Sequence, residues 1–317
     1  MSHQKLNFLS NIYFWLILLS GFLYSGFLVV ASQKIIPALL MQLIFLLDAL
    51  KFNDNIVGLI TSRLFLLNVI PGLILIGLIS QFGKTLIKSA KSIHSTDLFI
   101  NGLKIIKITQ QFTQFRSDNS LIFTSGFFKP RIFASSTLFK THNWEEIKAM
   151  LQHEIHHQKN LHPLKIFLAN FTKLILPALP GKNWLLDNYL TLVEVSSDQF
   201  SEDKTKNKLP LVSALLKFQN RGFEPMVTGI SCFNSQSERI KILVGQKKQW
   251  LKIPMAYYSL ILVVILSGTL FIKNSDIFFD CQHLLKCIEI LITPNSQSLI
   301  TSVNSSKNTF FLSDHCQ

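Results

Sequence analysis

The sequence His153-Glu154-Ile155-His156-His157 places two histidines four residues apart, with a glutamate directly after the first. Residues at this spacing share one face of an α-helix, so His153 and His157 can bind one metal ion together. Zinc held by three protein ligands keeps one position for water and lowers the pKa of that water to about 7. The motif therefore predicts a zinc site at which Glu154 acts on the bound water. Such a short motif also arises by chance, and an exposed helix face rich in His and Glu is the alternative interpretation.

The residues before the motif have the pattern of a helix start. Asn143 can cap a helix, and Glu146, three residues later, can complete a capping box. The apolar residues Ile147, Met150 and Leu151 then follow at helical spacing. The motif is therefore expected in the middle of a helix, where both histidines can face the same metal.

A second helix, predicted over residues 184–200, carries two acidic residues on one face. Glu194 and Asp198 are one helical turn apart. We predict Glu194 as the third metal ligand, and Asp198 as the acceptor of a hydrogen bond from a ligand histidine. A carboxylate in that position fixes the histidine tautomer and raises its basicity. Two solvated acids on an exposed helix face are the alternative.

Two further segments carry a family resemblance. The sequence FTSGFFKPRIF at 123–133 resembles the strand-turn-strand segment of integral-membrane zinc peptidases, and SERIKIL at 237–243 resembles a later helix of the same proteins. These are the BlaR/MecR-type sensor-transducer peptidases and their HtpX-type relatives. The resemblance covers about residues 120–245. It rests on a fixed order of features, namely Gly126, Pro130, the motif helix, Glu194, Asp198 and Arg239.

The resemblance implies a gluzincin-like zinc peptidase domain with a small β element, set between transmembrane helices in a mainly α integral membrane protein. It leaves two roles open for Arg239, which either stabilises the oxyanion of the tetrahedral intermediate or ties the C-terminal helix to the motif helix. The sensor-transducers carry a large penicillin-binding domain after the last span, whereas here about 45 residues without an S-x-x-K sequence follow. Direct β-lactam sensing is therefore not expected.

Two other histidines lie near the predicted ligands. His156 is inside the motif but off the ligand face, and His162 precedes Pro163 where the relatives often carry an aspartate. We interpret both as residues beside the ligands or on the surface. A direct contact of His162 with substrate or metal is the remaining alternative.

The composition is typical of a membrane protein. Hydrophobic residues make up 48% of the chain and charged residues 15%, whereas about a quarter of the residues in soluble chains are charged. A membrane-spanning helix needs roughly 20 mostly apolar residues. We predict spans at residues 11–31, 64–79 and 254–272.

Three apolar segments have more than one interpretation. Residues 11–31 also fit a signal peptide cleaved after Ala31, although their apolar core exceeds the usual length of roughly 7–15 residues. Residues 164–179 are interrupted by lysines and a proline, which favours an interfacial or embedded helix beside the site over a full span. Residues 35–50 are interpreted as a short amphipathic or re-entrant piece.

The predicted spans divide the chain into four regions. An N-terminal membrane region with two transmembrane helices precedes a zinc peptidase domain, which is followed by one transmembrane helix and a short extracytoplasmic tail. Their predicted bounds are 1–80, 81–253, 254–272 and 273–317.

The basic residues predict an orientation in the membrane. Residues 81–252 contain 24 of the 31 Lys and Arg and 12 of the 18 acids. Because positive charge concentrates on the cytoplasmic side, the peptidase domain is expected to face the cytoplasm from a multi-pass position in the inner (cytoplasmic) membrane. Nucleic acid is the rival partner for a basic chain. These residues flank the spans, so anionic lipid is the expected partner and no nucleic acid is expected.

Together these features predict a membrane-embedded zinc endopeptidase that cleaves a cytoplasmic regulator or a membrane protein. Glu154 takes a proton from the zinc-bound water and passes it to the leaving amine. The segment 121–133 is expected to present an edge strand that pairs with an extended substrate. The alternatives are an HtpX-like quality-control peptidase of broad range and a non-catalytic membrane sensor that keeps the fold.

Overall fold

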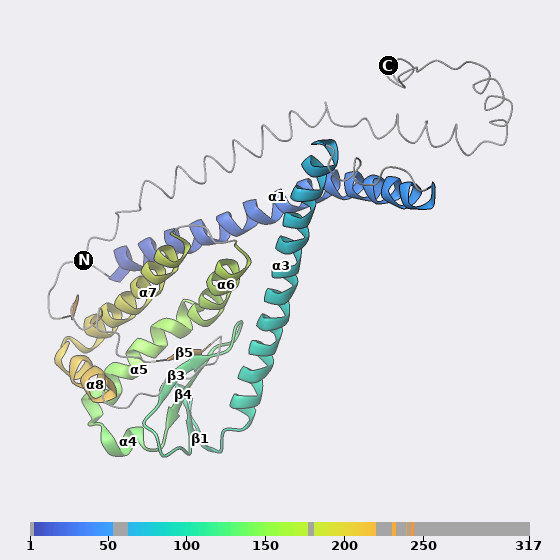
Figure 1. Ribbon diagram of the computed structural model, residues 1–317. Helices are drawn as coiled ribbons and strands as arrows, with labels where there is room; N and C mark the ends of the chain where they lie inside the picture. The colour runs from blue at the N-terminus through green and yellow to red at the C-terminus, as the bar shows by residue number, and fades with distance from the viewer. Residues whose placement is uncertain are drawn as a thin grey trace, which may run out of the picture. The chain divides into compact units, whose positions relative to one another are not determined.

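The computed structural model describes residues 3–52, 63–176, 181–219, 230–232, 239, 242 and 243. This part of the chain is mainly helical with one small sheet, as the sequence predicted (Figure 1). The predicted transmembrane helix 254–272 and the tail 273–317 lie outside the described residues.

Two long helices, α1 (His3–Phe52) and α3 (Arg63–Asn101), are long and apolar enough to cross a membrane. Their candidate spans, His3–Ile44 and Val69–Asn101, include residues 11–31 and most of 64–79. Large apolar side chains on both helices face outward, including Phe22, which is 77% exposed, and Leu73, which is 63% exposed. Such surfaces suit contact with lipid rather than water.

The prediction of a separate amphipathic or re-entrant segment at residues 35–50 is wrong. The helix α1 continues without interruption through Pro37 to Phe52. A proline inside a helix removes one backbone hydrogen bond and tends to kink the helix, but apolar segments tolerate it when packing holds both sides. A small cluster of Leu28, Ala31 and Leu75 joins α1 to α3 just before this point.

The sheet follows α3 and has the strand order β1-β2-β4-β3-β5 among the described residues. Strands β3 and β4 form an antiparallel hairpin in which Phe123 pairs with Phe133, and β5 pairs antiparallel with the other side of β3. Phe115, Phe123 and Phe133 fill the core on one face of the sheet. The strands are β1 (Ile105–Ile108), β2 (Thr113–Phe115), β3 (Ile122–Ser125), β4 (Arg131–Ser135) and β5 (Ile230–Cys232).

The motif helix is α5 (Trp144–Lys159), and it begins with the predicted capping box. The Asn143 side chain accepts a hydrogen bond from the Glu146 backbone N–H at 2.8 Å, and the Glu146 carboxylate accepts one from the Asn143 backbone N–H at 3.1 Å. The Glu146 carboxylate also accepts a hydrogen bond from Ser213 and pairs with Lys217, both on α8 (Leu209–Gln219). The buried Glu146 carboxylate thus caps the start of α5 and joins it to α8.

The helix α5 contacts β3 and β4 of the sheet and the helices α7 (Lys182–Thr205) and α8. The interface contains fully buried apolar side chains from the sheet, α5 and α8, including Ile132, Met150, Leu211 and Leu215. Burying each such side chain contributes about 1.5–3 kcal/mol. The short helix α4 (Leu138–Thr141) connects β4 to α5. The motif therefore lies in the interior of the described fold.

The helix α6 (His162–Ile175) corresponds to the predicted interfacial segment 164–179. At 14 residues it is too short for the alternative of a full span, which needs roughly 20. It packs against both candidate membrane helices, since Lys165 donates a hydrogen bond to Asn11 on α1 and Gln81 on α3 donates one to the Leu174 carbonyl. The helix α1 also lies along α7 (Figure 1).

The turn of the β3–β4 hairpin requires glycine. Gly126 has a φ of 110°, and an added Cβ would lie 3.1 Å from the Lys129 carbonyl oxygen. We expect Gly126→Ala to lower the free energy of unfolding by about 1–3 kcal/mol. Thermal unfolding in detergent measures this change. Gly83→Ala is the control, because an added Cβ in α3 meets nothing within 4 Å. Equal stability of Gly126→Ala and wild type would contradict this account of the hairpin.

Candidate metal centre

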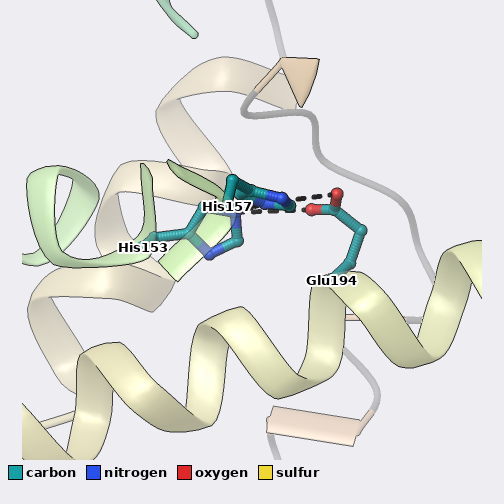
Figure 2. Close-up of side chains that lie close together, drawn as sticks. All are labelled: His153, His157 and Glu194. Atoms are coloured by element: carbon teal, nitrogen blue, oxygen red, sulfur yellow. Dashed lines mark hydrogen bonds and ion pairs between the residues drawn. The ribbon is translucent and has the colours of Figure 1, made fainter. Parts of the chain in front are cut away.

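The helices α5 and α7 bring three ligand-type side chains to one point (Figure 2). The Glu194 carboxylate oxygens lie 3.4 Å from His153 Nε2 and 3.5 Å from His157 Nε2, and the two Nε2 atoms are 3.0 Å apart. All three side chains are buried, and one ligand atom from each lies within 4.8 Å of the others. The residues predicted as ligands therefore form a group that can hold a metal ion.

The imidazole of His153 is supported from its other side. Its Nδ1 lies 2.9 Å from the Asp198 carboxylate, as the spacing of Glu194 and Asp198 on α7 predicted. Burial alone lowers the pKa of His153, but hydrogen bonding to Asp198 and Glu194 outweighs burial and raises that pKa to about 9. This carboxylate holds a proton on Nδ1 and leaves Nε2 to face the other ligands.

Arg239 is fully buried against the carboxylates of α7. Its Nη2 lies 2.6 Å and its Nε 3.1 Å from the two Asp198 oxygens, and its Nη1 lies 2.9 Å from Glu194. Burial, the largest effect, raises the pKa of both carboxyls, but the guanidinium and the neighbouring histidines together outweigh it and lower each pKa to about 2. These contacts join Arg239 to α7, whereas the predicted structural role joined it to the motif helix α5.

Glu154 is fully buried on α5, next to His153. Thr124 on β3 donates a hydrogen bond of 2.6 Å to its Oε2. Burial raises the pKa of Glu154 to about 7, against the lowering effects of His153 and of the Thr124 hydrogen bond. A carboxyl with a pKa near neutral is suited to accept and return a proton. The sequence did not indicate Thr124, because this contact forms only where β3 packs on α5.

Both remaining histidines of this region are interior, so the surface interpretation is wrong for each. His156 is 3% exposed; its Nδ1 lies 3.0 Å from the Ser197 hydroxyl and its ring packs on Phe200. His162 is 1% exposed, and its Nδ1 lies 2.9 Å from His157 Nδ1. His162 thus contacts a ligand, whereas the His156 ring contacts Ser197 and Phe200 on α7 and the His162 ring on α6.

The prediction that the segment 121–133 presents a free edge strand to the substrate is also wrong. The strand order places β3 between β4 and β5, with Thr124 paired to Ser231 on the β5 side, and β4 between β2 and β3. Neither strand of the 121–133 segment is therefore an edge of the described sheet. The sequence could not predict this arrangement, because β5 comes from residues about 100 positions later.

No protein-family model and no curated protein matches the chain. The relationship to BlaR/MecR-type peptidases therefore stays a prediction that rests on the residues quoted above.

The geometry predicts which side chains bind metal. We expect about one metal ion per chain in the detergent-purified protein and a loss of that metal in His157→Ala, because the remaining ligands are too few to compete with water. Elemental analysis by mass spectrometry measures the number of metal ions per chain in each variant. Glu154→Gln is the control within the same motif and should keep the metal. Retention of the metal by His157→Ala, or equal loss in both variants, would contradict the ligand assignment.

Arg239 is expected to be essential for stability. Arg239→Met leaves Glu194 and Asp198 without their countercharge in the interior, and removal of one partner of a buried ion pair costs about 3–5 kcal/mol. Thermal unfolding in the presence of a chelator should show this loss, and the double variant Arg239→Met, Asp198→Asn should recover part of it. A single variant as stable as wild type would disprove the structural role.

Proposed function

We propose that the chain is a membrane-embedded zinc-dependent endopeptidase of the gluzincin type. The observation that carries this proposal is the position of Glu154, a buried carboxyl held by Thr124 directly beside a His-His-Glu metal group. A metal site that serves only stability has no need of a fourth, proton-accepting group at this point. The same observation argues against a non-catalytic sensor.

The donor set favours zinc. Two imidazoles and one carboxylate, with a position left for water, form a known ligand set of catalytic zinc, whereas Mg²⁺ and Ca²⁺ prefer oxygen ligands. Ligand atoms about 2.0–2.1 Å from a tetrahedral zinc lie roughly 3.3–3.4 Å apart. The distances of 3.4 and 3.5 Å from Glu194 to the two histidines fit this spacing, and the 3.0 Å between the two Nε2 atoms is shorter than it.

Bound zinc would polarise the carbonyl group of the substrate and lower the pKa of a bound water. Glu154 takes a proton from that water and returns it to the amine that leaves when the peptide bond breaks. Thr124 holds Oε2 of this carboxylate and thereby fixes its plane. Asp198 keeps the His153 ring turned so that Nε2 faces the metal position, and Arg239 keeps Asp198 and Glu194 ionised.

We place this peptidase with the BlaR/MecR-type family, in the inner membrane with the catalytic domain facing the cytoplasm. The two candidate membrane helices and the basic residues that follow the second one support this location. A protein or peptide is the proposed substrate and the lipid bilayer the proposed surrounding, and no nucleic-acid partner is proposed. A cytoplasmic regulator or a membrane protein is the expected target.

A peptide library prepared from a whole proteome tests the activity. The purified chain should generate new peptide termini, and Glu154→Gln should lower their rate of formation by about 10²–10⁴-fold while keeping its metal. Mass spectrometry of the new termini provides the measurement. Cleavage at a few related sequences would favour a dedicated regulator as substrate, and cleavage at many unrelated sequences would favour HtpX-like quality control. A Glu154→Gln variant as active as wild type would contradict the proposal.

A further inference from the structure

The ligand His157 makes contacts through both of its ring nitrogens. Its Nε2 faces His153 and Glu194, and its Nδ1 lies 2.9 Å from Nδ1 of His162. Both rings are buried, at 0% and 1% exposure, and they meet edge to face with centroids 4.9 Å apart. A nitrogen–nitrogen distance of 2.9 Å between buried rings is that of a hydrogen bond.

The chemistry of imidazole decides the direction of this hydrogen bond. Neutral imidazole carries one proton, so one nitrogen donates and the other accepts. When Nε2 of His157 is the ligand atom, the proton of that ring is on Nδ1, and His157 therefore donates to His162. His162 then accepts through Nδ1 and carries its own proton on Nε2.

The two ligand histidines are thus supported in the same way by different groups. His153 has a carboxylate, Asp198, 2.9 Å from its Nδ1, and His157 has the neutral ring of His162 at the same distance. We propose that His162 is a positioning residue of the metal centre, whose Nδ1 fixes the tautomer and ring orientation of His157. This inference rests on the metal-binding part of the proposed function and not on peptide cleavage.

The backbone supports this assignment. His162 is the first residue of α6, and it follows Leu161, which has a φ of 52° in the left-handed region. A leucine in this conformation costs about 1–2 kcal/mol and persists only where its surroundings require it. The strained residue makes the tight turn from α5 into α6 and brings the His162 ring back onto His157. Asn160 closes the end of α5 by donating to the His156 carbonyl at 3.0 Å.

A matched pair of variants tests the hydrogen bond. His162→Asn keeps an acceptor near the place of Nδ1, and His162→Leu has a similar shape without an acceptor. The dissociation constant for Zn²⁺ is measured on the full chain in detergent by competition with a chromophoric chelator. We expect His162→Leu to weaken zinc binding by about 10–100-fold and His162→Asn to recover most of that loss. The Co²⁺ absorption spectrum should shift in His162→Leu and stay near wild type in His162→Asn.

His142→Leu is the control, because it removes a buried histidine at the start of α5 whose Nδ1 lies 2.8 Å from the Thr141 hydroxyl, away from the ligand group. It should change zinc affinity by less than about threefold, well below the 10–100-fold effect of losing a ligand's supporting contact. Wild-type affinity in a folded His162→Leu chain, or equal losses in His162→Leu, His162→Asn and His142→Leu, would overturn the inference. The expected zinc affinities of the His162 variants, together with a wild-type chain that cleaves no peptide, would instead overturn the proposed function alone. A wild-type chain that binds no zinc would overturn both.

Discussion

The pairing of the two α7 carboxylates with His153 and Arg239 is the interaction on which the site depends. Glu194 and Asp198 carry two negative charges into the interior, and such charges are tolerated only when they are paired and hydrogen-bonded. Without a bound cation, Arg239 and a protonated His153 balance them. A divalent cation held by His153, His157 and Glu194 would replace the His153 proton and leave one positive charge in excess, which would favour the ionised form of Glu154. The same charge network therefore holds α7 against α5 and lies beside the carboxyl that we propose as the proton acceptor.

The site is also joined to the candidate membrane helices through one element. The helix α6 begins with His162, in contact with a ligand, and ends where Gln81 of α3 reaches the Leu174 carbonyl. At the first turn of α6, the Lys165 side chain donates a hydrogen bond to Asn11 of α1. Because α6 is amphipathic and too short to cross a bilayer, it connects the buried site to both long helices without being a span itself. This arrangement connects the metal-type group to both candidate membrane helices, as the proposed function requires.

Local patterns in the sequence predicted the parts of the site that lie on single helices. The Asn143–Glu146 capping box, the spacing of His153 and His157, and the one-turn separation of Glu194 and Asp198 all follow from helix geometry, and the structure has each of them. Contacts between distant elements were not predictable in this way. Thr124 reaches Glu154 only through the packing of β3 on α5, and β5 covers the edge of β3 from far along the chain. The interior position of His156 and His162 likewise depends on α1, α6 and α7 closing around the end of α5.

X-ray absorption at the zinc edge of the detergent-purified chain tests the central claim most directly, because it reports the atoms around the metal. The account predicts two imidazole nitrogens at about 2.0–2.1 Å and carboxylate or water oxygens at about 2.0–2.2 Å, in a four-coordinate site. A spectrum with sulfur ligands at about 2.3 Å, or with a single imidazole, would contradict a centre built from His153, His157 and Glu194.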